Sequence, residues 1–437
     1  MKRMFHGGVH PHDHKETRDL AIVQIPLPDE LAVSLSQHIG APARPIVSRG
    51  DRVLKYQPIA EPSGFVSAGL HAPTSGTVKG IEPMSHPSGR FIPAIIIEPD
   101  GLNEAGDTLK HADPDLEKGP EAWKEMVRNA GIVGMGGAAF PTHVKLNPPK
   151  DKPIDLVVAN GVECEPFLTA DHRVMLEDPD PIIGGLRLAM EIVGAGRAIV
   201  AIEANKPDAA EKIRSMDLPP GCEVDVLPVR YPQGAEKQLI FALTGRQVPS
   251  GGLPMDVGVV VQNVGTLAAI HEAVTTGRPL VERVMTLGGT VPKGPGNYRV
   301  VMGTPLSHII ETTGGLQGPA ARIISGGPMM GLPLSGFESS MTKGTSGLLV
   351  FGARDFRELQ SRPCIRCGSC VRACPVHLLP HTLGNLVEWD HFDELEEYHI
   401  RDCIECGCCT YICPADRNLV QYIRQGKAEL LARSRSK

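Results

Sequence analysis

Cys364-Ile-Arg-Cys367-Gly-Ser-Cys370-Val-Arg-Ala-Cys374-Pro375 is followed, with the same cysteine spacing, by Cys403-Ile-Glu-Cys406-Gly-Cys-Cys409-Thr-Tyr-Ile-Cys413-Pro414. Both stretches have the pattern C-x2-C-x2-C-x3-C-P. Three cysteines at steps of three residues let a short loop curl around one cubane and present a thiolate to three of its irons. The proline cannot continue a hydrogen-bonded helical turn, so it directs the following segment elsewhere. The doubled stretch therefore predicts a small domain that holds two iron-sulfur clusters.

In the bacterial ferredoxin pattern, the fourth cysteine of each run ligates the cluster of the other run. The spacing thus predicts two [4Fe-4S] clusters with crossed ligands, one on Cys364, Cys367, Cys370 and Cys413 and the other on Cys403, Cys406, Cys409 and Cys374. Cys408 is left without a cluster. Structural zinc is the alternative, but it usually takes two separated C-x2-C pairs and needs neither a third cysteine in step nor the proline.

Composition bounds the class of protein. A chain of 437 residues suffices for two to four domains, and its 48 glycines and 39 prolines indicate many turns. The net charge of −6 and the lack of a basic stripe argue against nucleic acid as a partner. No apolar stretch reaches about 18 residues, which predicts no transmembrane segment. The first residues also lack the apolar region of an export signal.

Four of the 16 histidines, His6, His10, His12 and His14, lie within the first fourteen residues. A loose metal-binding tract and a solvated tail are both consistent with this pattern. We expect the tail, because histidines at a mobile terminus need not converge on one ion.

Short β-prone runs separated by proline and glycine follow this arm, and they predict a small all-β sandwich. The stretch His71-Ala-Pro-Thr-Ser-Gly-Thr-Val78 resembles the hairpin of biotinyl and lipoyl carrier domains, which have barrel-sandwich folds. No lysine stands at the hairpin tip, so the resemblance implies the fold and not a swinging arm. The predicted strands are 46–53, 57–59, 65–68, 76–81 and 91–97.

The segment Gly131-Ile-Val-Gly-Met-Gly-Gly-Ala-Ala-Phe-Pro-Thr-His-Val-Lys145 is rich in glycine. Glycine lets the backbone approach a ligand, and consecutive amide groups form a concavity that suits phosphate. Apolar runs at 154–159, 226–231 and 257–261 predict parallel strands, each followed by a polar loop. Because ligands bind at the carboxyl ends of such strands, we expect these loops to form one pocket with the glycine-rich segment.

These loops resemble those of the FMN- and NADH-binding subunit of respiratory complex I. In that family, segments with the patterns Gly-Arg-Gly-Gly-Ala-Gly-Phe-Pro-Thr, Asn-Ala-Asp-Glu-x-Glu-Pro, Gly-Glu-Glu-Thr and Asn-Asn-Val-Glu-Thr hold FMN. Three departures, Met135, Val162 and Ala235, affect NADH binding more than FMN binding. By position, the resemblance implies cofactor-binding roles for Gly134, Gly136, Gly137, Lys145, Asn160, Glu163, Glu165, Gly234, Glu236, Asn263 and Thr266.

The order of modules, with the opening Phe5-His-Gly-Gly-Val-His-Pro11, resembles the C subunits of Rnf-type electron-transport complexes over nearly the whole chain. The nearest alternative family, the flavin and iron-sulfur cobalamin reductases, begins with its flavin module and lacks a counterpart of residues 1–100. The expected fold class is multidomain α/β and α+β. The predicted domains are an arm at 1–29, a barrel-sandwich module at 30–105, a complex-I-flavoprotein-like FMN/NADH-binding α/β domain at 116–256, an SLBB-like β-grasp domain at 257–345 and a helical two-cluster ferredoxin-like domain at 355–437.

The resemblance implies an NADH-linked oxidoreductase subunit of an ion-translocating ferredoxin:NAD+ oxidoreductase complex. Its cofactors would be FMN, NAD(H) and two [4Fe-4S] clusters, and it would sit peripherally at the cytoplasmic face of the bacterial inner membrane. Partner membrane and iron-sulfur subunits would connect it to ferredoxin. A hydride carries two electrons and a cluster takes one, so the flavin must stand between them. The alternative is a non-catalytic wiring and assembly subunit without a nucleotide, which the departures at Val162 and Ala235 leave open.

Overall fold

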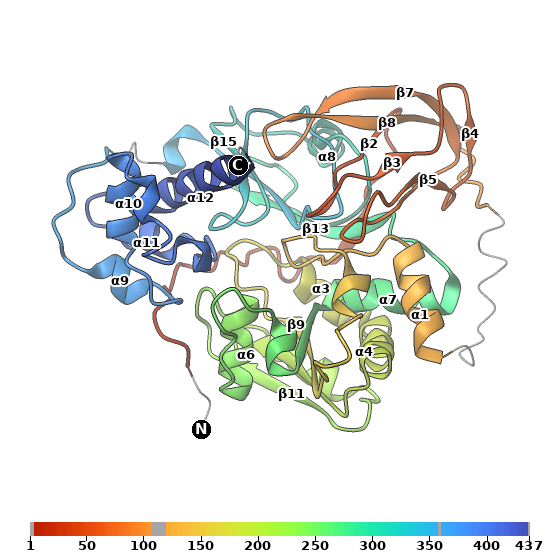
Figure 1. Cartoon of the computed structure of the whole chain (residues 1–437). Coiled ribbons are helices and arrows are strands. Elements are labelled where there is room, and N and C mark those ends of the chain that lie inside the picture. Colours follow the sequence, from red (N-terminus) through yellow and green to blue (C-terminus); the bar gives the residue numbers. More distant parts are fainter. Residues whose placement is uncertain (1–3, 107–118, 357–359, 436–437) are drawn as a thin grey trace.

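The computed structural model describes residues 4–106, 119–356 and 360–435. These ranges form an N-terminal arm and four modules (Figure 1). A parallel α/β domain lies at the bottom of the view, a β-sandwich at the upper right and a cysteine-rich helical module at the left, with a mixed sheet between the last two. Residues 107–118, which include most of the stretch between the predicted barrel-sandwich and flavin domains, lie outside the described residues.

The α/β domain is built on a four-stranded parallel sheet in the order β11-β10-β9-β12. β9 and β10 are the inner strands, and most of their residues are buried, so their sequences are continuous apolar runs. Because all strands run in one direction, the loops after β9 and β12 emerge at the same edge. The strands are β9 (Leu156–Gly161), β10 (Arg197–Glu203), β11 (Cys222–Leu227) and β12 (Val259–Asn263).

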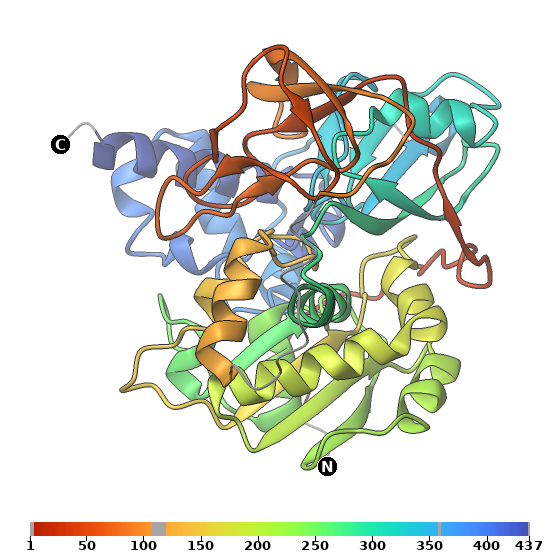
Figure 2. The ribbon, with the colours of Figure 1, turned by 90° about the vertical axis from the view of Figure 1, so that its right-hand side faces the viewer.

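Helices pack against this sheet, and α4 and α7 lie side by side in front of it (Figure 2). Gly185 of α4 lies so close to α7 that a Cβ there would come within 1.9 Å of the carbonyl oxygen of Leu267. The helices are α1 (Gly119–Asn129), α2 (Thr142–Lys145), α3 (Ala170–Glu177), α4 (Pro179–Val193), α5 (Pro207–Arg214), α6 (Glu236–Thr244) and α7 (Val264–Thr276).

The sheet differs from the sequence prediction in two places. The strand predicted at 226–231 is wrong, since β11 ends at Leu227 and begins four residues earlier. β11 is an edge strand whose residues are mostly half-buried, so its apolar signal is weak. β12 pairs with the central strand β9, and the α/β domain therefore continues through α7, past the predicted boundary at 256.

Two small sheets form the β-sandwich, and their inner faces enclose a core that includes Leu31, Ile59 and Ile95. The strand predicted at 65–68 is wrong, because this stretch bends between Gly64 and Gly69 before β6 begins. One sheet contains β2 (Leu31–Ser34), β4 (Arg52–Val53), β7 (Gly76–Ser85) and β8 (Phe91–Pro99), and the other contains β3 (Arg44–Pro45), β5 (Pro58–Glu61) and β6 (Leu70–His71).

The β-grasp module has a six-stranded mixed sheet in the order β1-β14-β13-β17-β15-β16. β1 (Ile22–Gln24) comes from the N-terminal arm and adds a parallel edge strand against β14. The other elements are β13 (Glu282–Gly289), β14 (Gly296–Val301), α8 (Leu306–Thr312), β15 (Arg322–Ser325), β16 (Leu332–Leu334) and β17 (Gly347–Phe351).

The ferredoxin-like module follows, with a core formed by Leu383, Leu395, Ile400 and Ile423. Short helices begin inside each cysteine run, and two longer helices pack together behind them. The helices are α9 (Ser369–Ala373), α10 (Pro380–Glu388), α11 (Cys408–Tyr411) and α12 (Leu419–Arg435).

The N-terminal arm is not the solvated tail that its histidines suggested. The backbone of Val9 exchanges hydrogen bonds of 2.8 and 3.0 Å with that of Tyr231, and Gly8 N donates to the carbonyl of Ala373 over 2.9 Å. The arm therefore joins the α/β domain to the ferredoxin-like module. Its buried side chains include Phe5, Val9, Lys15, Thr17 and Ile25.

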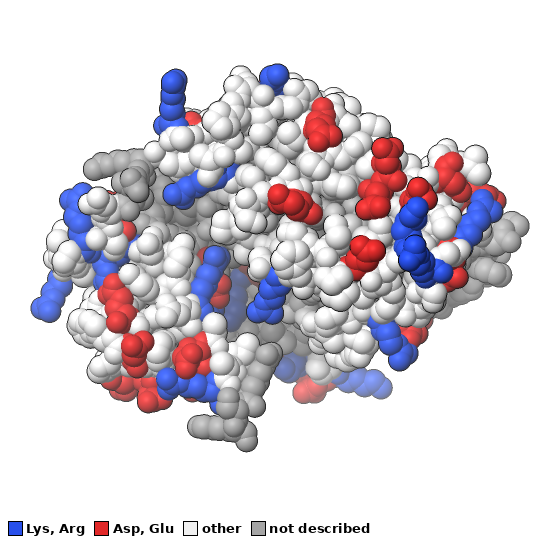
Figure 3. Space-filling model, turned by 90° about the horizontal axis from the view of Figure 1, so that it is seen from above, with Lys and Arg blue, Asp and Glu red and all other residues white. Residues whose placement is uncertain are grey.

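No helix within the described ranges is both long and apolar enough to cross a membrane. Acidic and basic side chains are interspersed over the face seen in Figure 3, in keeping with the modest net charge of −6.

Candidate cofactor sites

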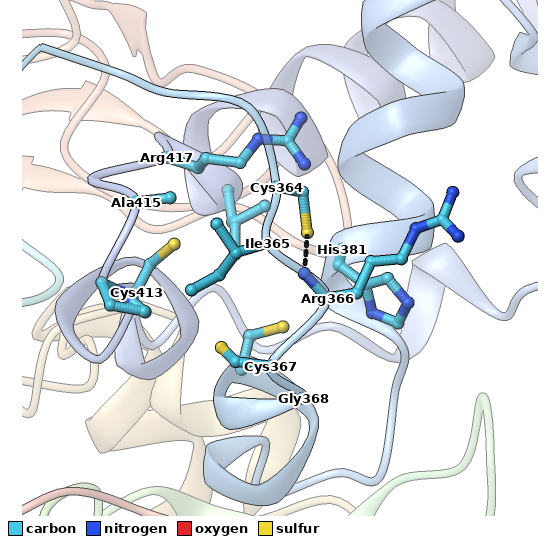
Figure 4. Close-up of a pocket in the computed structure, with 12 residues that line it drawn as sticks. Cys364, Ile365, Arg366, Cys367, Gly368, His381, Cys413, Ala415 and Arg417 are labelled. Atoms are coloured by element: carbon cyan, nitrogen blue, oxygen red, sulfur yellow. Dashed lines mark hydrogen bonds between the residues drawn. The ribbon is translucent and has the colours of Figure 1, made fainter.

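The first cysteine run and the last cysteine of the second run line one cavity of the ferredoxin-like module (Figure 4). The cavity has a volume of about 130 Å³. Its four thiols belong to Cys364, Cys367, Cys370 and Cys413, which are the ligands expected for the first cluster. Cys370 is buried and Cys367 is exposed, so one side of the cavity opens to solvent.

A second, smaller cavity of about 20 Å³ is lined by the remaining cysteines. It brings together Cys374, Cys403, Cys406 and Cys409, the ligands expected for the second cluster, and Cys408 lines it as well. All of these except Cys403 are buried. The structure thus groups the cysteines across the two runs, as crossed ligation requires.

The arrangement of sulfurs fits a cubane better than a single metal ion. Zinc-sulfur bonds of about 2.3 Å would draw the ligands around one point. In the part of the chain that the structure describes, however, no group of three or more His, Cys, Asp or Glu side chains is close enough to hold one ion. Four thiols spread around a cavity suit a [4Fe-4S] core, because each binds a different iron.

The two cysteine loops have the same backbone conformation. Arg366 and Glu405, at equivalent positions, have φ angles of 55° and 56°. The amide of each lies 3.4 Å from the sulfur of the first cysteine in its run. Hydrogen bonds to cluster sulfurs are one of the factors that set reduction potentials. The duplication in sequence is therefore also a duplication in structure.

Cys408 takes the place of Ser369 in this repeat. The hydroxyl of Ser369 lies 3.4 Å from the sulfur of Cys367, and the thiol of Cys408 shares a hydrogen bond with that of Cys406. Each side chain is thus placed to donate to a sulfur that would bind iron. By its place in the repeat, Cys408 lies beside a candidate cluster ligand without being one of the four expected ligands.

The glycine-rich loop lies against the first turn of α7. Met135 N donates to Oγ1 of Thr266 over 2.8 Å, and Asn263 Oδ1 caps the helix by accepting from the amides of Gly265 and Thr266. A Cβ on Gly136 would lie 3.3 Å from Cβ of Asn263. Thr266 is fully buried, so it supports the loop and does not face a ligand directly.

Other residues expected to bind the cofactor contact one another in pairs. Lys145 Nζ lies 2.6 Å from Glu236 Oε1, and Asn160 Nδ2 donates to the carbonyl of Gly234 over 2.9 Å. These contacts join the glycine-rich segment and the loop after β9 to the turn before α6. All four segments expected to hold FMN therefore meet at one edge of the parallel sheet.

Glu163 and Glu165 contact different parts of the molecule. The carboxylate of Glu163 accepts from two amides in the first turn of α3, over 2.7 and 3.3 Å. That of Glu165 accepts from the amides of Met329 and Met330, over 3.0 and 2.8 Å. Burial raises the pKa of Glu165 to about 7, although these two amides oppose the shift. Both carboxylates are therefore engaged in holding neighbouring backbone.

The tip of the glycine-rich loop fits a phosphate group. Among the described residues, no hydrogen bond uses the amides of Gly136 and Gly137, and both residues are exposed. A Cβ on Gly137 would meet no atom within 4 Å, so the space beside it is open. Free backbone donors beside open space are what an anionic ligand requires.

Sequence reasoning missed two buried lysines that organise the loop after β9. Lys15 Nζ donates to the carbonyls of Glu163 and Glu165 over 2.9 and 2.8 Å, and Lys206 Nζ donates to that of Val162 over 2.7 Å. Burial lowers the pKa of Lys15. A lysine at the end of a histidine-rich arm has no local pattern that would predict such a contact, so only the fold reveals it.

The second cavity borders the candidate flavin site. The hydroxyl of Tyr231 donates to the carbonyl of Cys406 over 2.8 Å. A Cβ on Gly407 would lie 3.1 Å from the carbonyl oxygen of Met329, whose amide is held by Glu165. In contrast, every residue that lines the first cavity belongs to the ferredoxin-like module.

Known families match four successive segments of the chain. They are the RnfC barrel sandwich hybrid domain at 3–102, the Nuo51 FMN-binding domain at 127–272, the SLBB domain at 284–333 and the 4Fe-4S dicluster domain at 363–417. These matches confirm the expected fold class. They also confirm FMN and iron-sulfur clusters as the expected cofactors.

Two relatives match this chain over nearly its whole length. The C subunit of the proton-translocating ferredoxin:NAD(+) oxidoreductase complex of Clostridium ljungdahlii is 48% identical over 98% of this chain and 94% of its own length. The Na(+)-translocating counterpart of Acetobacterium woodii is 44% identical over 99% and 98%. Among solved structures, a chain of an NAD+-reducing [NiFe]-hydrogenase in the H2-reduced state has 22% identity and a TM-score of 0.49, covering 73% of this chain and 63% of that one. The chain belongs to the family of C subunits of ion-translocating ferredoxin:NAD(+) oxidoreductase complexes.

Proposed function

We propose that this chain passes electrons between NAD(H), FMN, two [4Fe-4S] clusters and the other subunits of a membrane-bound complex, which links ferredoxin and NAD+ chemistry to ion translocation. The presence of an FMN-binding domain and a dicluster domain in one chain supports the proposal. The observation that carries it is the direct contact between the two, through Tyr231 and Cys406. Electrons need a short path between cofactors, and this contact holds together the two domains that would bind them.

When bound, FMN accepts two electrons as a hydride and releases them one at a time. The chain contributes the binding site. The amides of Gly136 and Gly137 would hold the phosphate, while Asn263 and Thr266 keep the loop in place. Lys145 and Glu236 hold the facing turn in position. The carboxylates of Glu163 and Glu165 position the backbone segments whose amides donate hydrogen bonds to them.

The proposal includes attachment to the cytoplasmic face of the cell membrane through partner subunits. Two observations support it: the relatives are named as subunits of ion-translocating complexes, and NAD(H) is a cytoplasmic substrate. We also propose the domain limits given above, with the α/β domain extended through α7 because β12 and α7 pack with its sheet.

A direct test is to add NADH to the purified chain after loading it with flavin and clusters. Bleaching of the flavin absorbance is expected, followed by reduction of the clusters. Flavin that binds but does not bleach would favour the non-catalytic wiring subunit instead.

The binding loop is tested by Gly137→Leu, which should lower flavin content and leave iron content unchanged. Gly50→Leu is the matched control, since Gly50 also has a positive φ and open surroundings but lies in the β-sandwich. Equal flavin content in the two variants would remove the loop from the site.

A further inference from the structure

The two cysteine loops share a backbone but differ in what covers them. Ile404, in the second loop, is partly buried and packs, like Met329, against the buried cluster that contains Tyr231. Its counterpart Ile365 is 67% exposed. A Cβ on Gly407 would meet the backbone of Met329, whereas one on Gly368 would meet only the flexible side chain of Arg372. The rest of the chain therefore covers one copy of the loop and leaves the same face of the other copy open.

Charge at the equivalent positions follows the same division. Glu405 is paired within the chain, with Arg424 at 3.0 Å and Lys427 at 2.9 Å. Arg366, its counterpart at the rim of the first cavity (Figure 4), has no ion pair among the described residues. The second loop thus has its charged partner inside the molecule, and the first loop does not.

Two further arginines border the same opening. Arg372 donates to the carbonyl of Cys367 and to the hydroxyl of Ser369, each over 3.1 Å, and neither acceptor carries a formal charge. Arg362 lies 4.0 Å from Asp416, and this is the one ion pair that these arginines make within the described ranges. The opening is therefore cationic, with one exposed apolar side chain, Ile365, at its centre.

An electron that enters at the flavin must leave the chain at another place. None of the cysteines that line the second cavity is exposed, and the cluster that includes Tyr231 packs beside it. The first cavity has the exposed ligand Cys367 and the open rim. We propose that the face formed by Arg362, Ile365, Arg366 and Arg372 is the docking surface for an acidic partner protein that carries a one-electron redox centre. This inference rests on the proposed function and adds the partner's charge and its point of contact.

Crosslinking in the assembled complex tests the contact without relying on activity. Ile365→p-benzoylphenylalanine is illuminated in the purified complex, and Phe91→p-benzoylphenylalanine, at the exposed start of β8 in the β-sandwich, is the control. The expected result is a crosslink from position 365 to an Asp- and Glu-rich segment of a redox subunit, with a different product or none from position 91. A crosslink to a basic segment, to a lipid or to a subunit without a redox centre would overturn the proposal, as would none from position 365.

Electron exchange with small ions tests the charge. Hexacyanoferrate(III) is an anion and hexaammineruthenium(III) is a cation, and each accepts one electron from the reduced chain. The variant Arg362→Gln/Arg366→Gln/Arg372→Gln is compared with Arg44→Gln/Arg187→Gln/Arg197→Gln, which removes the same charge from exposed ion pairs elsewhere. At low salt the first variant should reduce the anion about tenfold more slowly and the cation faster, because the lost positive charge attracts the anion and repels the cation.

The control variant should keep both rates, and added salt should remove the difference. Equal effects of the two triple variants would overturn the proposal. Arg372 contacts Cys367, so iron content is measured in each protein, and Arg362→Gln/Arg366→Gln replaces the triple variant if iron is lost. Dithionite serves as a second electron donor. If NADH fails as a donor but dithionite gives the expected pattern, the proposed function is wrong and the docking surface stands.

Discussion

Among the described residues, twelve residues other than glycine have a left-handed backbone; six lie in the ferredoxin-like module and three lie in or beside the candidate flavin loops. Ala139 has a φ of +49°, Glu163 of +46° and Phe167 of +68°. Such conformations cost about 1 kcal/mol or more each and persist where the surrounding structure enforces them, commonly at functional sites. Ala139 is also a fourth departure from the flavin-binding pattern, which has glycine at this position, beside those at Met135, Val162 and Ala235.

We expect Ala139→Gly to stabilise the protein by up to about 1 kcal/mol, because glycine adopts a positive φ without the steric cost that alanine pays. The change in the urea midpoint of unfolding measures this. Flavin content should stay the same or rise. A loss of stability would mean that the Ala139 methyl group, which is buried, contributes more by packing than it costs in backbone strain.

The buried carboxyl of Glu165 should make stability depend on pH. Its pKa rises from an ordinary 4.5 to about 7 on folding, so between these values the folded state binds more protons than the unfolded state. Stability from this group is then present below about pH 4.5 and is lost as the pH rises through 7. Relative to Glu165→Gln, the natural protein should lose up to about 3 kcal/mol between pH 5 and pH 8. Parallel pH profiles of urea unfolding would contradict this.

The role of a single residue was predictable only where its residue type, in that sequence pattern, has one dominant function. The cluster cysteines fall into the two expected groups because their spacing alone fixes how a loop can wrap a cubane. The roles of Glu163 and Glu165 could not be read in this way, because a loop carboxylate binds a ligand or a backbone amide equally well. Lys15 was unpredictable, since its acceptors lie far along the chain.

At the scale of elements, the cysteine loop is used twice with the same backbone and in two environments. Positive φ at Arg366 and Glu405, followed by Gly368 and Gly407, turns each loop in the same sense. The fourth cysteine of each run then enters the other cavity. Each cavity therefore depends on both halves of the repeat.

Crossed ligation predicts which variants resemble one another. Cys374→Ala should damage the cluster held by Cys403, Cys406 and Cys409, and so give the same spectroscopic loss as Cys406→Ala. Electron paramagnetic resonance of the reduced protein distinguishes this from the loss caused by Cys367→Ala. If Cys374→Ala instead gave the Cys367→Ala spectrum, each run would close on its own cluster. Cys408→Ala should keep about eight irons per chain and shift only a potential.

Among strands, periodicity predicted those that are buried and failed where burial is partial. β9 lies where its apolar run placed it, with most of its residues buried. The edge strand β11 was misplaced toward Tyr231 because its own residues are half-exposed. The run 257–261 was predicted as a parallel strand beside the flavin pocket, and β12 does pair with β9, so the domain limit at 256 left out a strand that the same pattern placed in the sheet.

At the scale of the whole molecule, residues from one module reach into another. Lys343, from the β-grasp module, donates to the carbonyls of Gly69 in the β-sandwich and Gly131 in the α/β domain, over 2.9 and 2.6 Å. Burial lowers its pKa to about 7. The N-terminal arm makes a similar junction between Tyr231 and Ala373. The candidate flavin site and the second cavity are therefore held at a fixed separation by groups that belong to neither.

The arm contact is tested by Gly7→Ala. Gly7 has a φ of +73°, and a Cβ there would lie 2.7 Å from the carbonyl oxygens of Ala373 and Cys374. Since backbone on both sides blocks the methyl group, we expect a loss of roughly 2 to 4 kcal/mol in the free energy of unfolding and faster proteolysis of the arm. Gly50→Ala, with a φ of +92° and no atom within 4 Å, should cost only about 1 kcal/mol. Similar losses in the two variants would show that the arm bears no such constraint.

The position of the arm also determines the order of events during synthesis. Residues 5–9 leave the ribosome long before their backbone partner Ala373, which lies more than 360 residues further along the chain. At about 5 to 20 residues per second this delay is on the order of 20 to 70 seconds. Because Gly7 contacts the carbonyl of Cys374, itself a candidate cluster ligand, the arm can settle only after that cysteine is in place. Residues 5–9 are thus among the last parts of the chain to reach their final position. A nascent protein exposes the surface that they will cover until its C-terminal module has formed.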